Sequence, residues 1–309
     1  MVDKGLVKGM MLTQRHHVER CDACHIGKQK KKPNNKKIGP RFETSEPSSN
    51  GTRFEAVVII RDGISRFVTM HILTSKASKT VKDHIKEYIL WAERQAGANR
   101  IKYVVQQVLT DKGGEFVNEV MKKWYHVHGI EHIRVGPKSA QLNLCERTHQ
   151  SIVEMTKAMM HHAGFSKSLW PETMRNAVYV DNRVYHKGIQ EIPYKLMFCT
   201  KPDIHHIGKF GSLAYVHVPV TPGRRKHHAN ASIGLNLGYA EEVVGCKVYF
   251  PEERTGKYVA DLRVAEDVVY SDGYDVSVED ADMESLHFSR TEDTDYYRNS
   301  FLRGRPHYK

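Results

Sequence analysis

The sequence predicts a mixed α/β domain over about residues 51–195, followed by a small all-β, barrel-like domain over 205–271. In the first region, two strand-like runs precede helices that alternate with further strands. In the second region, short apolar runs are separated by Gly, Pro and Asn, which is typical of small antiparallel barrels. A chain of 309 residues also exceeds the usual size of one domain, so two units with flanking segments are expected.

The α/β region opens with a predicted hairpin. Residues 56–60 are apolar and β-branched, 61–65 contain a turn glycine, and 66–73 form a second strand-like run. Apolar residues then recur at helical spacing, which predicts an amphipathic helix over 78–95 that ends near Gly97.

Strands and helices then alternate to the end of the α/β region. A buried strand is expected over 103–109, followed by a helix through Trp124 and a strand over 130–135. Two further helices are expected, one that ends near Ala163 and one over 170–184. This order indicates a mixed sheet flanked by helices.

The all-β region is built from five short apolar runs, which we predict to be strands: 213–218, 233–237, 247–250, 258–264 and 268–270. Beyond them, residues 272–309 hold few large apolar side chains and change from acidic to basic. We expect this tail to be disordered.

The charge balance indicates a polyanionic partner. Lys and Arg number 47 against 36 for Asp and Glu, a net charge of +11. Two basic clusters are candidate contacts for DNA phosphates: Lys28, Lys30, Lys31, Lys32 and Lys37 in the first, and Arg224, Arg225 and Lys226 in the second. The alternative is a solvated tail and a solvated turn. The paired histidines His161-His162 and His205-His206 are interpreted as ordinary surface residues.

The five cysteines are an odd number without a signal peptide, which favours a reducing compartment over secretion. No run approaches the ~20 apolar residues that a membrane span needs, so no membrane partner is expected. Cys21 and Cys24 have the spacing of half a structural zinc site. The alternative is a pair of plain thiols in a mobile arm.

Two carboxylates are candidate ligands of a catalytic metal pair. Asp111 follows a predicted buried strand and precedes two glycines, which leaves its carboxylate accessible to a hard ion such as Mg²⁺. Glu146 lies near the start of a predicted helix and can converge on the same ions. The alternatives are a turn in which Asp111 acts as a cap, and a solvated Glu146.

The order and spacing of several motifs resemble the integrase region of copia-type retrotransposon polyproteins. The resemblance covers about residues 1–270 and rests on Gly39-Pro40, 61–66, 110–116, 129–132, 141–147, Leu169-Trp170, Asn182-Arg183, Lys201-Pro202, Phe210-Gly211 and 235–239. It implies a ribonuclease H-like core that binds Mg²⁺ or Mn²⁺ through three acidic residues. It also implies 3′-end processing of element DNA and strand transfer into a target, with Asp111 and Glu146 as two of the acidic residues.

The chain departs from that family pattern in three places. Lys36 stands where the family has its first catalytic Asp, which removes a ligand and adds a positive charge. The segment before Glu146 is one residue short, and the Gly that usually follows Asn143 is absent. Asp62 is a minority candidate for a substitute carboxylate, because it lies at a hairpin turn. The family's two upstream zinc histidines are also missing, so residues 1–50 are expected to be a truncated zinc-binding arm with a basic linker.

Two functions follow as expectations. The first is an integrase-type polynucleotidyl transferase with impaired catalysis, acting on element and target DNA in the nucleus or a cytoplasmic particle, with a homo-oligomer possible. The alternative is a non-catalytic remnant that binds nucleic acid without metal dependence.

Overall fold

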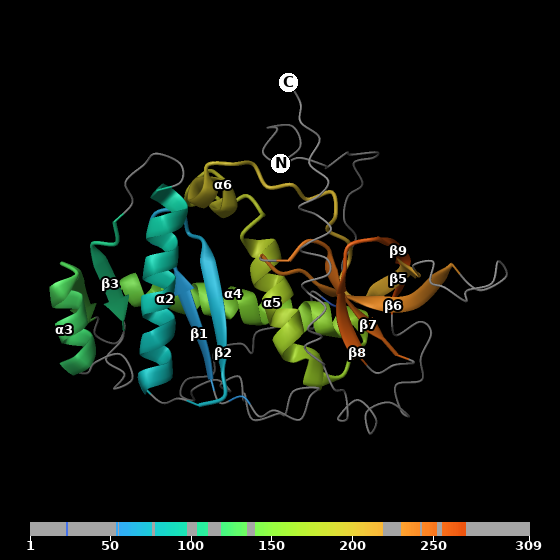
Figure 1. Cartoon of the computed structure of the whole chain (residues 1–309), viewed down its shortest axis with the longest axis horizontal. Coiled ribbons are helices and arrows are strands. Elements are labelled where there is room, and N and C mark those ends of the chain that lie inside the picture. The colour runs from blue at the N-terminus through green and yellow to red at the C-terminus, as the bar shows by residue number, and fades with distance from the viewer. Residues whose placement is uncertain are drawn as a thin grey trace, which may run out of the picture.

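In the computed structural model, the described residues are 23, 54, 56–75, 78–97, 104–110, 119–134, 140–218, 230–241, 243–251 and 255–269. They form a mixed α/β part and a separate antiparallel sheet, which lies beside helix α5 (Figure 1). The predicted class, an α/β region followed by an all-β region, is confirmed. No described helix is both long enough and apolar enough to span a bilayer.

The centre of the α/β part is the predicted hairpin of β1 (Ala56–Arg61) and β2 (Val68–Leu73). Successive side chains of a strand point to opposite faces. Val57 and Ile59 accordingly pack in one apolar cluster, and Val58 and Ile60 in another. The hairpin therefore separates two cores, and every apolar residue of β1 is used.

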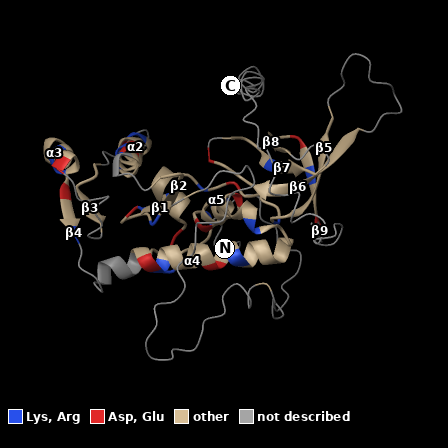
Figure 2. Ribbon diagram, turned by 90° about the horizontal axis from the view of Figure 1, so that it is seen from below, with Lys and Arg blue, Asp and Glu red and all other residues tan. Residues whose placement is uncertain are grey.

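Helices cover both faces of this hairpin. Figure 2 shows α2 (Ser78–Gly97) on one side of β1 and β2, and α4 (Ala140–Ala163) on the other. Val81, Ile85 and Ile89 of α2 are buried at helical spacing, as predicted from their period. The remaining elements of this part are β3 (Gln107–Thr110), α3 (Glu119–Val127), β4 (Glu131–Arg134), η2 (Lys167–Leu169), α5 (Trp170–Asp181) and α6 (Pro193–Phe198).

The expected single mixed sheet is divided in the described residues. β1 and β2 form one antiparallel pair, while β3 and β4 form a parallel pair of their own. The β3–β4 pair and α3 lie at the end of the molecule that is farther from the antiparallel sheet (Figure 1).

The second part is a five-stranded antiparallel sheet in the order β8-β7-β6-β5-β9. Its strands are β5 (Ser212–His217), β6 (Ala231–Gly238), β7 (Cys246–Phe250), β8 (Thr255–Val259) and β9 (Leu262–Val269). The predicted barrel is not closed among these strands, because β8 and β9 stay at opposite edges. The prediction of one strand over 258–264 is also wrong. The chain turns at Ala260 and Asp261, so this run belongs to two strands.

Two other boundaries differ from prediction. Helix α5 ends at Asp181 rather than continuing to Val184. Helix α6 has no counterpart in the predicted elements, and it begins at Pro193, whose fixed φ suits a first helical position. The domain boundary predicted at residue 195 thus falls inside α6.

The two parts are joined by a junction between α5 and the sheet, formed by Glu172, Asn176 and Tyr179 of α5 with Gly238, Tyr239 and Lys247 of the sheet. Lys247 Nζ lies 3.1 Å from the carboxylate of Glu172, which also pairs with Arg175 at 2.9 Å. Gly238 has φ +105, and a Cβ there would lie 2.7 Å from the Cβ of Asn176. Only glycine satisfies both the backbone conformation and this close approach.

A buried arginine reinforces the junction just beyond α5. Arg183 donates two hydrogen bonds of 2.7 Å to the carboxylate of Glu241. Its guanidinium also lies 3.4 Å from the ring centroid of Tyr179. Planar bidentate pairing and stacking are both characteristic of arginine, so Lys would not replace it.

Candidate functional site

Of the two carboxylates predicted to bind the catalytic metal, only Glu146 lies among the described residues. It is in the first half of α4, where Cys145, Glu146 and Arg147 are all exposed. Glu146 forms no ion pair with another described residue, so binding of a cation to its carboxylate would break no ion pair found there. The charged residues along α4 are of both signs (Figure 2).

The other predicted site residues lie outside the described residues. These are Asp111, Cys21, Cys24, Lys28, Lys30, Lys31, Lys32, Lys37, Arg224, Arg225 and Lys226. Lys36, which replaces the first catalytic Asp of the family pattern, also lies outside them. The expected convergence of Asp111 with Glu146, the partial zinc site and both basic clusters therefore remain predictions.

The strand that precedes Asp111 in the sequence differs from the prediction of a buried strand over 103–109. β3 begins at Gln107 and ends at Thr110, and Leu109 is 43% exposed because β3 pairs only with β4 among the described residues. Thr110 is the last residue of β3 and is buried, and its Oγ1 lies 2.8 Å from His132 Nε2 on the parallel neighbour β4. Burial, with a smaller contribution from Arg134, lowers the pKa of His132. A neutral imidazole at this position holds the end of β3 to β4 without adding positive charge.

Arg61 connects the end of β1 to the part of α4 that carries Glu146. Its Nη1 donates a 2.7 Å hydrogen bond to Thr148 Oγ1, and its Nη2 lies 3.5 Å from His186 Nε2. Asp181, at the end of α5, belongs to the same neighbourhood. Burial raises the pKa of Asp181, while His186 and Arg61 act in the opposite direction. This group was not predicted because its members are far apart in the chain, although an Arg at a strand end is a signal for a polar site.

Asp62 has a structural role that accounts for its burial. Its Oδ2 accepts hydrogen bonds from the Ile64 nitrogen at 3.1 Å, the Ser65 nitrogen at 2.6 Å and the Ser65 hydroxyl at 2.7 Å. An Asp that organises its own turn in this way is a common feature of hairpin connections. These bonds favour the turn interpretation over the minority hypothesis of a substitute metal ligand.

Known proteins resemble both parts of this chain. The Retroviral polymerase SH3-like domain family matches residues 212–278, which include the antiparallel sheet from β5 to β9. The Pol polyprotein from transposon TNT 1-94 of Nicotiana tabacum is 26% identical over 259 residues, covering 77% of this chain and 18% of the polyprotein. The resemblance to copia-type Pol polyproteins is thereby confirmed.

Two Arabidopsis thaliana polyproteins are similar as well. The Pol polyprotein from transposon RE2 is 28% identical over 66% of this chain, and that from transposon RE1 is 29% identical over 55%. The chain spans 14% and 11% of their lengths, so it corresponds to a small section of each polyprotein.

Retroviral integrase cores occur among the similar solved structures. The alignment with the catalytic core domain of BIV integrase covers 46% of this chain and 84% of the BIV chain. The sequence identity is 15% and the TM-score is 0.35. The HTLV-2 integrase catalytic core domain, solved in complex with magnesium in a trimeric form, covers 46% of this chain and 92% of its own. Its identity is 12% and its TM-score 0.34.

Proposed function

We propose that this chain is the integrase-type section of a retrotransposon polyprotein and that it acts on DNA. The observation that carries the proposal is the similarity to three Pol polyproteins, which reaches 77% of the chain and extends across both structural parts. The match to an SH3-like domain directly after the α/β part supports the same domain order. A ribonuclease H-like core is the fold that this order implies for the first part.

In this proposal Asp111 and Glu146 hold a divalent cation, either Mg²⁺ or Mn²⁺. The described part of the site is compatible with that role, because Glu146 is exposed and β3 ends in a buried Thr110 next to Asp111 in the sequence. When bound, such an ion would stabilise the charge that develops on oxygen during phosphoryl transfer. Arg61 and Arg147 lie on or beside the same segment of α4 and are candidates to bind a phosphate of the DNA.

A second candidate function is DNA binding without catalysis, and the observation that favours it is Lys36. A lysine at the expected place of the first acidic ligand opposes cation binding by its charge as well as by the missing carboxylate. The basic clusters are independent of this position, so DNA binding with a strong dependence on salt would persist. A homo-oligomer and a location in the nucleus or a cytoplasmic particle belong to both proposals.

One assay distinguishes the two functions. The purified chain is tested for DNA nicking and strand transfer in Mn²⁺, beside Asp111→Ala and Lys36→Asp. Activity that Asp111→Ala abolishes supports the transferase as the chain stands. If the unmodified chain binds DNA but neither nicks nor joins it, and Lys36→Asp restores these reactions, then Lys36 has inactivated an integrase core. Activity that survives Asp111→Ala contradicts the proposed metal site.

A further inference from the structure

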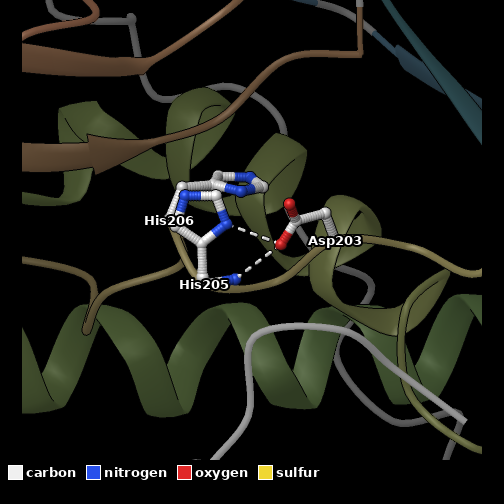
Figure 3. A group of neighbouring side chains, drawn as sticks. All are labelled: Asp203, His205 and His206. Atoms are coloured by element: carbon white, nitrogen blue, oxygen red, sulfur yellow. Dashed lines mark hydrogen bonds and ion pairs between the residues drawn. The ribbon is translucent and has the colours of Figure 1, made fainter. Parts of the chain in front are cut away.

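Three potential metal ligands meet on the connection between α6 and β5, and none of them belongs to the proposed catalytic residues. They are Asp203, His205 and His206, and Figure 3 shows their side chains gathered on this connection. One ligand atom from each of the three lies within 4.8 Å of the others. From sequence the two histidines were interpreted as ordinary surface residues, whereas the structure gives them specific partners.

His206 is held in one orientation by two tyrosines. Its Nε2 lies 2.9 Å from the Tyr179 hydroxyl, and its ring packs edge-on against Tyr239 with the centroids 5.3 Å apart. Since Nε2 is engaged by Tyr179, Nδ1 is the nitrogen left for a ligand. A histidine with one nitrogen fixed by a hydrogen bond is the usual arrangement of a metal ligand.

Asp203 and His205 are more exposed and can adjust to an ion. His205 Nδ1 lies 2.6 Å from Asp203 Oδ1, and the side chains of His205 and Asp203 are 67% and 52% exposed. Ligand atoms around tetrahedral zinc lie about 3.3–3.6 Å apart, given bonds of about 2.0–2.2 Å. Binding would require these distances to adjust, and the exposure of both side chains leaves room for that rotation. The positive charge of Arg183, which acts on His206, is paired with Glu241, and this pairing limits its repulsion of a cation.

We infer that Asp203, His205 and His206 form a binding site for a divalent transition-metal ion, with Zn²⁺ as the natural occupant. Two imidazoles and one carboxylate match the ligand preference of zinc rather than that of Mg²⁺, which takes oxygen ligands. Solvent supplies the fourth position, because Asp203 and His205 are exposed. Through Tyr179, the ion would attach the α6–β5 connection to helix α5 and so stabilise the junction between the two parts. This site is independent of the proposed function and of Cys21 and Cys24.

Binding is tested on the full chain carrying Cys21→Ser and Cys24→Ser, which removes the other predicted zinc ligands. Isothermal titration with zinc chloride is expected to give one site, and His205→Gln is expected to weaken it by at least about 10–100-fold. His161→Gln is the matched control, since His161 is also an exposed member of a histidine pair and lies on α4. Equal zinc affinity in His205→Gln and His161→Gln would overturn the inference.

Two further measurements identify the side chains that hold the ion. Asp203→Asn and His205→Gln should melt at the temperature of the unmodified chain in EDTA and lose only the stabilisation that zinc adds. Cobalt in place of zinc should give visible ligand-field bands without thiolate charge transfer. A thiolate band in the doubly substituted chain would assign the ion to Cys145, Cys199 or Cys246 and reject the histidine site.

Discussion

The junction around α5 and the first half of α4 differ in how their polar residues are used. At the junction, Arg183 is 7% exposed and Glu172 12% exposed, and each has a charged partner on the antiparallel sheet or at its edge. On α4, Cys145, Glu146 and Arg147 are exposed, and Arg61 reaches this segment through Thr148. Polar side chains hold the two parts together at the junction, whereas those on α4 remain available to a ligand.

This difference predicts that stability and DNA chemistry can be changed separately. Substitutions at the junction should lower the free energy of unfolding, because they leave buried groups without partners or force atoms too close together. Substitutions at the start of α4 should change function and leave stability nearly unaffected.

Alkaline pH should produce the largest effect on the junction. Burial raises the pKa of Tyr179, Tyr239 and Cys246, all in one cluster there, to about 12 in each case. In the unfolded chain these groups ionise near pH 10 for Tyr and 8.5 for Cys, so above those values the unfolded state has lost protons that the folded state retains. Stability is thus fully present below about pH 8.5 and falls as pH rises toward 12.

Thermal melts between pH 7 and 11 test this expectation. The melting temperature should drop steadily above pH 9, and Cys246→Ala should reduce the slope at the lower end of that window. A melting temperature that stays constant to pH 11 would contradict the assigned burial of these groups.

Gly238→Ala should be the most damaging single substitution at the junction, by about 2–4 kcal/mol. It combines a positive φ with a Cβ only 2.7 Å from the Asn176 side chain. Gly63→Ala is the control, because a Cβ at Gly63 meets nothing within 4 Å, and its expected effect is within ~0.5 kcal/mol. Urea denaturation measures both, and equal midpoints would refute the close contact between α5 and the sheet.

Arg183→Met should cost somewhat less, about 2–3 kcal/mol. The substitution keeps much of the apolar stem but leaves the Glu241 carboxylate without its bidentate partner. Because Glu241 is 36% exposed, water compensates part of the loss. Glu241→Gln in the same denaturation series should cost less than Arg183→Met, and the reverse order would argue against this assignment.

A matched pair of Glu→Gln substitutions should have the smallest effects on the free energy of unfolding. The pair also distinguishes the junction from the first half of α4. Glu172→Gln weakens the pairs that the mostly buried Glu172 forms with Lys247 and with the half-exposed Arg175, and it should cost about 1–2 kcal/mol. Glu146→Gln should leave stability within ~0.5 kcal/mol. In the active background, with Lys36→Asp if needed, Glu146→Gln should abolish Mn²⁺-dependent nicking while Glu172→Gln keeps it. Retained nicking in Glu146→Gln would remove Glu146 from the proposed metal site.

Local patterns predicted most of the fold, and the failures have physical reasons. Val57 and Val58 point to opposite faces of the hairpin and pack in different clusters, as alternation in a strand predicts. The helical period of α2 was readable because one face of this helix packs in the core. Helix α6 was missed because six residues are too few to show a period. The turn at Ala260 and Asp261 was missed because neither Gly nor Pro marks it.

The candidate site was less predictable than the fold. Asp111 and Glu146 were singled out by their place after a strand and near a helix start, and the family resemblance made the pair specific. The tie between His206 and Tyr179 joins residues 27 positions apart. Pairing over that distance depends on tertiary packing, which no local pattern reveals.

The order of the antiparallel sheet also bears on self-association. β8 and β9 are the two outer strands of the sheet in the part of the chain that the structure describes. Outer strands can pair with another chain unless they are protected. β9 carries exposed Arg263, Glu266 and Asp267, charges that disfavour the addition of a further strand. The charges of β9 thus oppose a merging of sheets from two copies of the chain along this strand.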